Sequence, residues 1–296
     1  MAEAADAVET VRASARQAAQ RIVFQGQPGA YSHLACRQVM PDVEALPAES
    51  FEDAFKALRE GEVDRAMIPI DNSVAGRVAD IHHLMPHAGL AIVAEHFQRV
   101  NHHLLGLPGT RLAEIRLIHS HIHALSQCRR LFRELGLMPQ IHADTAGAAK
   151  EVAATGRRDQ AAIASRLAAE IYGLEILRSD IEDEAHNTTR FVILSREPIE
   201  PPPYEGPVIT SFLFQVRNVP AALYKALGGF ATNGVNMIKL ESYVDAAFNQ
   251  AQFYAEIMGH PSELGVRHAF DELAFFSDEI EWLGVYPAHP FRFKEM

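Results

Sequence analysis

The sequence has little cysteine, no long apolar run and no excess of positive charge. Only Cys36 and Cys128 occur among 296 residues, far apart and without a CxxC pair, which excludes a disulfide framework and the usual structural zinc spacings. No apolar run approaches the roughly 18–20 residues of a membrane-spanning helix. The formal net charge of −11 argues against a nucleic-acid partner, because such proteins need a basic surface.

The first twenty residues are rich in alanine and mix acidic with basic side chains. They lack the apolar segment of a secretory signal peptide. We interpret them as an N-terminal tail, and we expect a cytoplasmic protein.

The chain is long enough for two domains, since domains cluster near about 100–150 residues. Its content of 48% hydrophobic and 22% charged residues is typical of globular domains. Prolines at residues 198–207 predict an extended linker, because proline fixes φ and removes a backbone donor. The predicted organisation is a tail at 1–20, a first domain at 21–197, this linker, and a second domain at 208–290.

Strand and helix patterns alternate in the first domain. Ser50 resembles a helix N-cap with Asp53 three residues later, and its helix is expected to end near Gly61. The other predicted elements are strands at 21–24, 66–70, 115–118, 161–164 and 190–194 and helices at 32–39, 124–135 and 166–172. Such alternation is typical of an α/β domain with a mostly parallel sheet, in which ligands bind beyond the carboxyl ends of strands.

The second domain reads as strand, helix, strand, strand, helix, strand, which is the ferredoxin-like α+β plan. The predicted strands are 212–216, 238–244, 252–258 and 282–286, with a turn at 245–250. The predicted helices carry the apolar faces Leu223, Leu227, Phe230 and Val266, Phe270, Leu273.

Three polar clusters stand beside predicted strands. The first is Asn187-Thr188-Thr189-Arg190-Phe191, directly before an apolar strand. Hydroxyl and amide groups position and protonate a ligand, and arginine binds a carboxylate through its planar fork. From the residues alone, a capped strand entry with a surface arginine remains open, and the cluster also contains a glycosylation sequon that a cytosolic protein does not use.

The second cluster, residues 69–76, places Asn72, Ser73 and Gly76 after an apolar strand. Backbone amides and a helix start can bind an anion there, although a plain helix N-cap fits equally well. The third cluster, residues 26–33, is a glycine turn before a helix. It lacks the full GxGxxG spacing, which argues against a dinucleotide site.

Taken together, in this order and at these separations, the three clusters resemble prephenate dehydratase. Further matching segments are residues 120–128, 144–146 and 164–174, and the resemblance covers nearly all of residues 21–290. It implies a two-lobed α/β catalytic domain similar to type II periplasmic binding proteins, with its active site in the cleft and no metal or organic cofactor.

The predicted catalytic residues are Thr189, Thr188 and Arg190, of which Thr189 and Arg190, followed by Phe191, match the Thr-Arg-Phe signature of the family. The family reaction turns prephenate into phenylpyruvate by expelling carbon dioxide and the ring hydroxyl. Thr189 matches the essential threonine and is expected to donate a hydrogen bond or proton to the leaving hydroxyl. Because threonine is a weak acid, a relay through Thr188 or water is expected. Arg190 is expected to bind a substrate carboxylate, which an acidic protein must attract locally.

Other residues are expected to bind and orient the substrate. These substrate-binding residues are Asn72, Ser73, Gly76, Ser32, Asn187 and Phe191. The sequence departs from the family pattern at Asp71, where glutamate is frequent, and at Ile122-His123, which replace proline and glutamine.

The second domain resembles an ACT domain, a ferredoxin-like module that binds amino acids where two copies pair. The resemblance implies feedback inhibition by L-phenylalanine and a homodimer or homotetramer. The expected ligand residues are Ala221, Ala222, Leu223, Asn236, Glu241 and Ser242. Tyr243-Val244 replace the frequent arginine and proline, and Ala221 replaces glycine. A purely structural dimerisation module is the alternative.

Three further alternatives remain open. The substrate is prephenate or arogenate, which differ at one carbon. A non-catalytic amino-acid sensor is the rival from another class. His119, His121 and His123 have the spacing of a strand face that binds zinc, but no acidic or thiol ligand accompanies them, so solvated or hydrogen-bonded histidines are expected.

Overall fold

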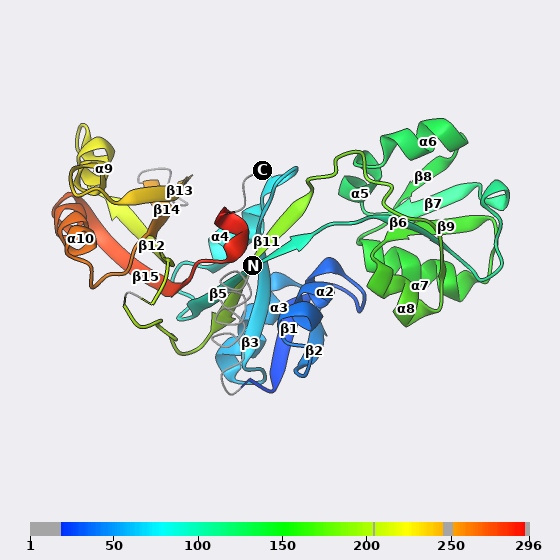
Figure 1. Cartoon of the computed structure of the whole chain (residues 1–296), viewed down its shortest axis with the longest axis horizontal. Coiled ribbons are helices and arrows are strands. Elements are labelled where there is room, and N and C mark those ends of the chain that lie inside the picture. The colour runs from blue at the N-terminus through cyan, green and yellow to red at the C-terminus, as the bar shows by residue number, and fades with distance from the viewer. Residues whose placement is uncertain (1–18, 204, 245–250, 294–296) are drawn as a thin grey trace.

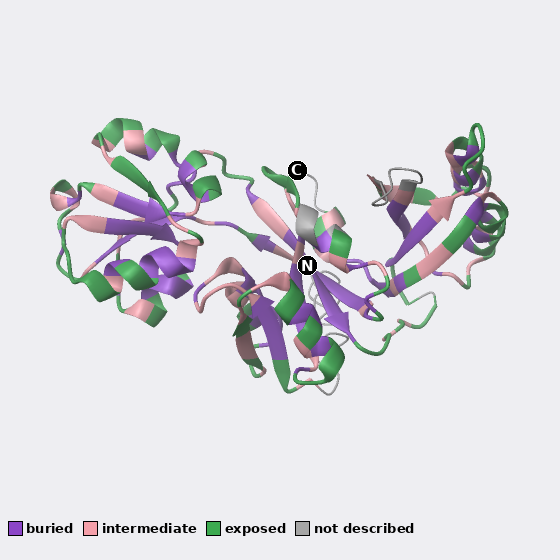
Figure 2. Ribbon diagram, turned by 180° about the vertical axis from the view of Figure 1, so that it is seen from behind, coloured by how far each residue is buried: buried purple, intermediate pink, exposed green. Residues whose placement is uncertain are grey.

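The computed structural model describes residues 19–203, 205–244 and 251–293. They form two α/β lobes and a C-terminal α+β domain, which lie in a row with lobe 1 in the middle (Figure 1). Buried residues follow the strands of all three bodies (Figure 2). Each body therefore has a packed interior of its own.

Lobe 1 contains a sheet with the strand order β2-β1-β3-β11-β5, and the short β4 pairs with β3. Helix α2 covers one face, where Phe24, Met67 and Phe191 are buried, and α3 and α4 cover the other face. The bounds are β1 Arg21–Gln25, α2 Tyr31–Val39, β2 Glu44–Ala48, α3 Phe51–Glu60, β3 Arg65–Asn72, β4 Gly76–Arg77, α4 Ala79–Leu84, β5 Ala91–Arg99 and β11 Thr188–Ser195.

Lobe 2 contains a second sheet, with the order β10-β6-β9-β7-β8. Helices α5 and α6 pack on one face and α7 and α8 on the other. The bounds are β6 His103–Gly106, η1 Leu112–Glu114, β7 Leu117–Ser120, α5 Ile122–Ser126, α6 Arg129–Leu135, β8 Met138–Ile141, α7 Thr145–Thr155, β9 Gln160–Ala164, α8 Arg166–Tyr172 and β10 Glu175–Arg178.

The chain crosses between the lobes twice, from β5 to β6 and from β10 to β11 (Figure 1). Strand β11 pairs antiparallel with β3 and β5, whereas β1 pairs parallel with β2 and β3. The sheet of lobe 2 also combines parallel and antiparallel strand pairs. The prediction of a mostly parallel sheet is therefore wrong. A strand that arrives from the other lobe needs no helical crossover, so it is free to pair antiparallel.

Local signals predicted several elements correctly. The Ser50 side chain accepts a hydrogen bond from the Asp53 amide at the start of α3, and Gly61 ends this helix with φ 79°. The predicted helix at 166–172 has the bounds of α8. These predictions are confirmed, because capping and periodicity depend on neighbours in the sequence.

Two local predictions for lobe 2 are wrong. The single helix predicted at 124–135 is two helices, with Gln127 and Cys128 in the break between α5 and α6. The strand predicted at 115–118 begins at Leu117, after η1. Apolar spacing continued through the break, so it concealed a turn that tertiary contacts of Gln127 maintain.

The C-terminal domain has the predicted ferredoxin-like order, with the sheet β13-β14-β12-β15. Helices α9 and α10 pack on one face of this sheet. The bounds are β12 Val208–Val216, α9 Ala222–Thr232, β13 Asn236–Val244, β14 Ala251–Met258, α10 Leu264–Phe276 and β15 Ser277–Pro287, followed by η2 Pro290–Phe293. The turn predicted at 245–250 lies outside the described residues.

The other face of the C-terminal sheet packs on lobe 1. Ile209, Tyr254 and Leu283 belong to the same buried cluster as Ile68 and Val192 of lobe 1. The described residues between β11 and β12 contain no helix or strand. The linker therefore joins two bodies that share a hydrophobic interior.

Candidate active site

The site is centred on Asn72, the last residue of β3, and Thr189, the second residue of β11. The two residues are direct partners in the antiparallel pairing of these strands, so their side chains share one face of the sheet. Asn72 Nδ2 donates a hydrogen bond of 3.0 Å to Thr189 Oγ1. The sequence prediction placed both residues in one cleft, and the structure brings them into contact.

The backbone fixes the direction of the Asn72 amide. Asn72 Oδ1 accepts hydrogen bonds from the amides of Val74 and Ala75, at 3.0 and 2.8 Å. Backbone N–H groups only donate, so the oxygen must face them and Nδ2 must face Thr189. Thr189 Oγ1 therefore accepts from Asn72, and its own proton is directed elsewhere.

An amide chain continues from Asn72 into lobe 2. Asn72 Nδ2 also donates to Asn187 Oδ1 at 2.8 Å, and Asn187 Nδ2 donates to Gln127 Oε1 at 2.6 Å. Gln127 Oε1 lies 3.1 Å from His102 Nε2. Since its oxygen accepts from this chain, the Nε2 of Gln127 remains a donor. These hydrogen-bonded amide side chains link β3, the crossing segment and the α5–α6 break.

Gln127 is a candidate site residue that sequence reasoning missed. It lies inside a segment that resembles the family, residues 120–128, yet no role was predicted for it. The available signal was an amide side chain within that segment, but the direction of its hydrogen bonds depends on Asn187, which lies 60 residues away.

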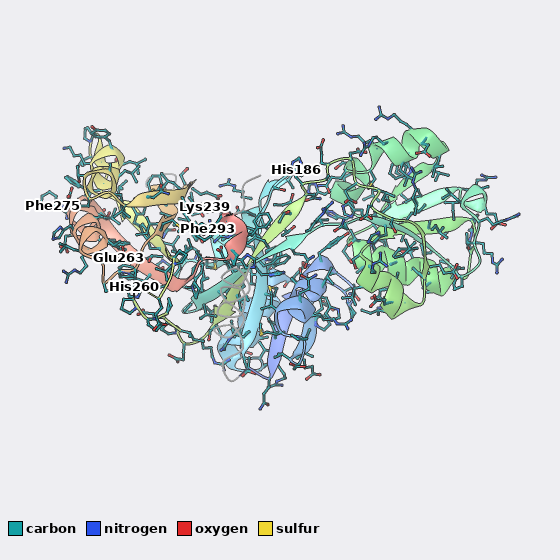
Figure 3. The ribbon with its side chains drawn as sticks, in the orientation of Figure 1. His186, Lys239, His260, Glu263, Phe275 and Phe293 are labelled. Carbon is teal, nitrogen blue, oxygen red and sulfur yellow. The ribbon has the colours of Figure 1, made fainter. Side chains whose placement is uncertain are left out.

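Ser73, Thr188 and Gly76 shape the loop around the site. Ser73 Oγ donates to the His186 carbonyl at 2.9 Å and accepts from the Thr188 amide at 2.9 Å. Gly76 has φ 83° at the β3–β4 hairpin. His186 lies where the chain passes between the lobes (Figure 3). These contacts anchor the crossing segment against β3.

The predicted relay through Thr188 does not agree with the structure. Adjacent residues of a strand point to opposite faces, and Thr188 Oγ1 donates to the His186 carbonyl at 3.3 Å. Its proton is therefore directed away from Thr189.

Arg190 points away from Asn72 and Thr189. Its Nε donates to Glu95 at 2.7 Å, its Nη1 to Glu256 at 2.9 Å and its Nη2 to the Tyr286 hydroxyl at 3.1 Å. Burial opposes the charge of Arg190, but Glu256, Tyr286 and Glu95 outweigh burial and raise the pKa of the guanidinium. This placement contradicts the prediction that Arg190 binds a substrate carboxylate. The physical reason is strand alternation, which turns Arg190 to the face opposite Thr189.

Two predicted substrate-binding residues lie apart from the contact between Asn72 and Thr189. Phe191 is 1% exposed and packs in the core under α2, which contradicts a substrate contact. Ser32 is buried at the second position of α2 and is not a hydrogen-bond partner of Asn72 or Thr189. Gln98 is the partner of Thr189 on β5 and lines a cavity of about 350 Å³ between the lobes.

The predicted regulatory residues occupy two places in the C-terminal domain. Ala221 has φ 61° at the N-cap of α9, followed by Ala222 and Leu223. Asn236 begins β13, and Glu241 and Ser242 lie further along it. Within the described ranges, no group of three or more histidine, cysteine, aspartate or glutamate residues is arranged to hold a metal ion.

The fold and the site define a class of protein. It is a two-lobed α/β body, with a series of hydrogen-bonded hydroxyl and amide side chains between the lobes, joined to a ferredoxin-like domain. Residues 22–199 match the family model described as prephenate dehydratase. The chain belongs to the prephenate dehydratase family.

Individual relatives agree with this assignment. The chain is 54% identical over 274 residues to a bifunctional N-acyl-homoserine lactone acylase/prephenate dehydratase of Komagataeibacter europaeus, covering 92% of this chain and 98% of that protein. It is 40% identical to arogenate dehydratase/prephenate dehydratase 1 of Arabidopsis thaliana, covering 90% and 72%. A solved prephenate dehydratase of Arthrobacter aurescens in complex with L-Phe has a TM-score of 0.83 and 30% identity, covering 91% and 90%.

We conclude that the protein is a dehydratase of aromatic amino acid biosynthesis with the two-lobed fold of its family. Family membership favours an enzyme over the rival interpretation, a non-catalytic sensor. Among the helices of the described residues, none has both the length and the apolar character to cross a membrane.

Proposed function

We propose that the protein converts prephenate to phenylpyruvate by decarboxylating dehydration. One observation carries this proposal: Asn72 donates to Thr189 Oγ1, so the Thr189 proton is available to a substrate. A hydroxyl held in this way is a directed hydrogen-bond donor at the end of a strand. Prephenate presents a hydroxyl that must leave, which is the acceptor such a donor needs.

The reaction needs modest help from the protein. The bond between the ring and its carboxylate breaks, carbon dioxide departs, and the electron pair completes the aromatic ring as the C–O bond breaks. The leaving hydroxide takes up a proton and becomes water. Thr189 stabilises that oxygen by a hydrogen bond, and water completes the proton transfer, because an alkoxide at Thr189 is costly. Positioned acid assistance contributes about 10²–10⁴-fold.

The test is turnover of prephenate by the wild type, Thr189→Ala and Thr189→Ser. We expect Thr189→Ala to lower kcat at least about tenfold, since it removes the donor without disturbing buried packing. Thr189→Ser keeps the hydroxyl and is expected to retain most activity. Near-normal turnover by Thr189→Ala contradicts the donor role.

The same assay on arogenate separates the two substrates. Relatives are named for each of the two substrates. Prephenate carries a carbonyl group at the carbon where arogenate carries an ammonium group. We propose prephenate as the preferred substrate. A higher kcat/KM for arogenate overturns that preference while leaving the dehydratase chemistry intact.

A second candidate activity is hydrolysis of N-acyl-homoserine lactones. It rests on the relative of Komagataeibacter europaeus, which is named for both activities and matches over 98% of its length. Water is added across the amide bond, which releases a fatty acid and homoserine lactone. Chromatography of an N-acyl-homoserine lactone incubated with the protein tests this activity, and an unchanged lactone rejects it.

We also propose that the C-terminal domain is an ACT domain and that L-phenylalanine inhibits the enzyme there. Asn236 follows the end of α9, whereas Ala221 precedes its start. The eleven-residue helix is about 16 Å long, so one amino acid that touches both ends needs two copies of the chain. The L-Phe complex of the Arthrobacter aurescens relative supports the ligand.

This arrangement requires a homodimer or homotetramer, and we propose a cytoplasmic enzyme. Sedimentation with and without L-phenylalanine, together with inhibition assays, tests the oligomer and the regulation. A monomer that L-phenylalanine inhibits contradicts the shared site.

A further inference from the structure

The two residues next to the site are held by the C-terminal domain. Asp71 precedes Asn72 on β3, and Arg190 follows Thr189 on β11. Strand alternation points them to the face of the sheet opposite the site. Lys239 Nζ lies 2.5 Å from Asp71 Oδ1, and Figure 3 shows Lys239 on the side of the C-terminal domain that faces lobe 1.

Arg190 is held more extensively than Asp71. Glu256 of β14 and Tyr286 of β15 accept hydrogen bonds from it at 2.9 and 3.1 Å. Glu95 of β5 accepts from Arg190 and also from Arg292, at 2.7 and 2.6 Å. Two guanidinium groups thus face two carboxylates. Both carboxylate side chains are 0% exposed, so water screens these pairs little and removal of one partner leaves a buried charge.

These contacts lie at an irregularity of the sheet. Arg190 pairs with Asp71, but Phe191 pairs with Pro69, so β3 has one extra residue at this point. A bulge of this kind disrupts the ladder locally and re-aims side chains, and bulges are common beside active sites. The register that joins Asn72 to Thr189 therefore depends on more than the ladder itself.

We propose that Lys239, Glu256 and Tyr286 are positioning residues for the reaction: through Asp71 and Arg190 they hold β3 and β11 in the register that directs Asn72 Nδ2 to Thr189. This inference rests on the proposed function of that pair. The C-terminal domain is then a working part of the catalytic site, with or without a bound amino acid. Lys239 also binds Glu241 at 2.7 Å, so one lysine contacts both the catalytic sheet and a predicted regulatory residue.

A positioning role predicts a change in kcat with little change in KM. Asp71 and its partner Lys239 lie on the face of the sheet opposite Asn72 and Thr189, so their loss leaves the groups on the site face in place. Misplacement of a reacting group by about 1 Å costs about 10²-fold in rate. The loss of Lys239 is therefore expected to reduce turnover even though Thr189 is intact.

The experiment compares Lys239→Met, Lys239→Arg and the control Lys56→Met, an exposed lysine on α3. We expect Lys239→Met to lower kcat at least about tenfold with KM within about threefold. Lys239→Arg is expected to restore most of kcat because it keeps the charge. Asp71→Asn combined with Lys239→Met is expected to lose less than the sum of the two single losses, because both variants remove the contact between Lys239 and Asp71.

Three kinetic results overturn the inference: kcat of Lys239→Met within about twofold of the wild type, a loss that the arginine does not restore, or additive losses in the double variant. Hydrogen exchange supplies a readout without substrate. Backbone amides of residues 71–73 and 188–190 are expected to exchange faster in Lys239→Met than in Lys56→Met, and equal exchange rejects the positioning role. A wild type that turns over neither prephenate nor arogenate rejects the proposed function instead, and the exchange data then decide the inference alone.

Discussion

The direction of one amide group decides what Thr189 can do. Asn72 has its oxygen against two backbone amides and its nitrogen against Thr189. No acidic or basic side chain is a hydrogen-bond partner of the Thr189 hydroxyl in the described part of the chain. In the proposed reaction, the Thr189 hydroxyl is therefore expected to act through its orientation, which suits a reaction driven by aromatisation.

Asn72→Asp tests this orientation with almost no change of shape. The new side chain keeps an acceptor for the amides of Val74 and Ala75, but it replaces the donor nitrogen with a carboxylate oxygen. The Thr189 hydroxyl is then expected to turn and donate to that carboxylate, away from the substrate. We expect kcat to fall at least about tenfold, measured by steady-state kinetics. A variant that raises only KM indicates charge repulsion of the substrate and contradicts the orientation.

At the scale of elements, β15 and β5 meet so closely that only glycine fits. A Cβ built on Gly284 overlaps the carbonyl oxygen of Ile92. This contact fixes the distance at which the C-terminal sheet lies from lobe 1. The ion pairs of Arg190 span the same interface, so their lengths depend on it.

Gly284→Ala is therefore expected to destabilise the protein by about 1–3 kcal/mol, the usual cost of overpacking. Gly228→Ala is the matched control. Gly228 lies inside α9 with no atom within 4 Å of an added Cβ, so alanine there is expected to add up to about 1 kcal/mol through helix propensity. Denaturant unfolding measures both changes, and equal effects contradict the close packing.

In the molecule as a whole, lobe 1 and the C-terminal domain are packed into one body. They share a hydrophobic cluster and a buried ion network. Burial by itself raises the pKa of the Glu95 carboxyl, but Arg190, Arg292 and the His289 amide outweigh burial and lower it. Glu95 therefore stabilises the folded chain in its charged form.

A lowered carboxyl pKa makes stability depend on pH in one direction. The contribution of Glu95 is present above the unfolded pKa, about 4.3, and is lost as the pH falls through the lower folded pKa. Glu95→Gln is expected to lower Tm at about pH 7, and the difference from wild type is expected to shrink below about pH 4. The fluorescence of Trp282, the only tryptophan, reports thermal unfolding of the C-terminal domain and so measures Tm. The exposed Glu60→Gln is the control, and a difference that stays constant with pH contradicts the role of charge.

The order of residues along the chain was enough to predict the local features of this protein. Capping at Ser50, the bounds of α8 and the ferredoxin-like order of the C-terminal domain follow from residues close together in the chain. The polar clusters around Asn72 and Thr189 were also identifiable, because their residue types and order carry the family resemblance.

Where those side chains point, and what they contact, became known only from the folded chain. Arg190 lies beside Thr189 in the sequence but on the opposite face of the sheet, where it meets Glu256, 66 residues away. Asn187 meets Asn72 across 115 residues. Periodicity and propensity act between neighbours, whereas strand register, the bulge at Ile70 and the docking of two domains depend on which distant surfaces pack together.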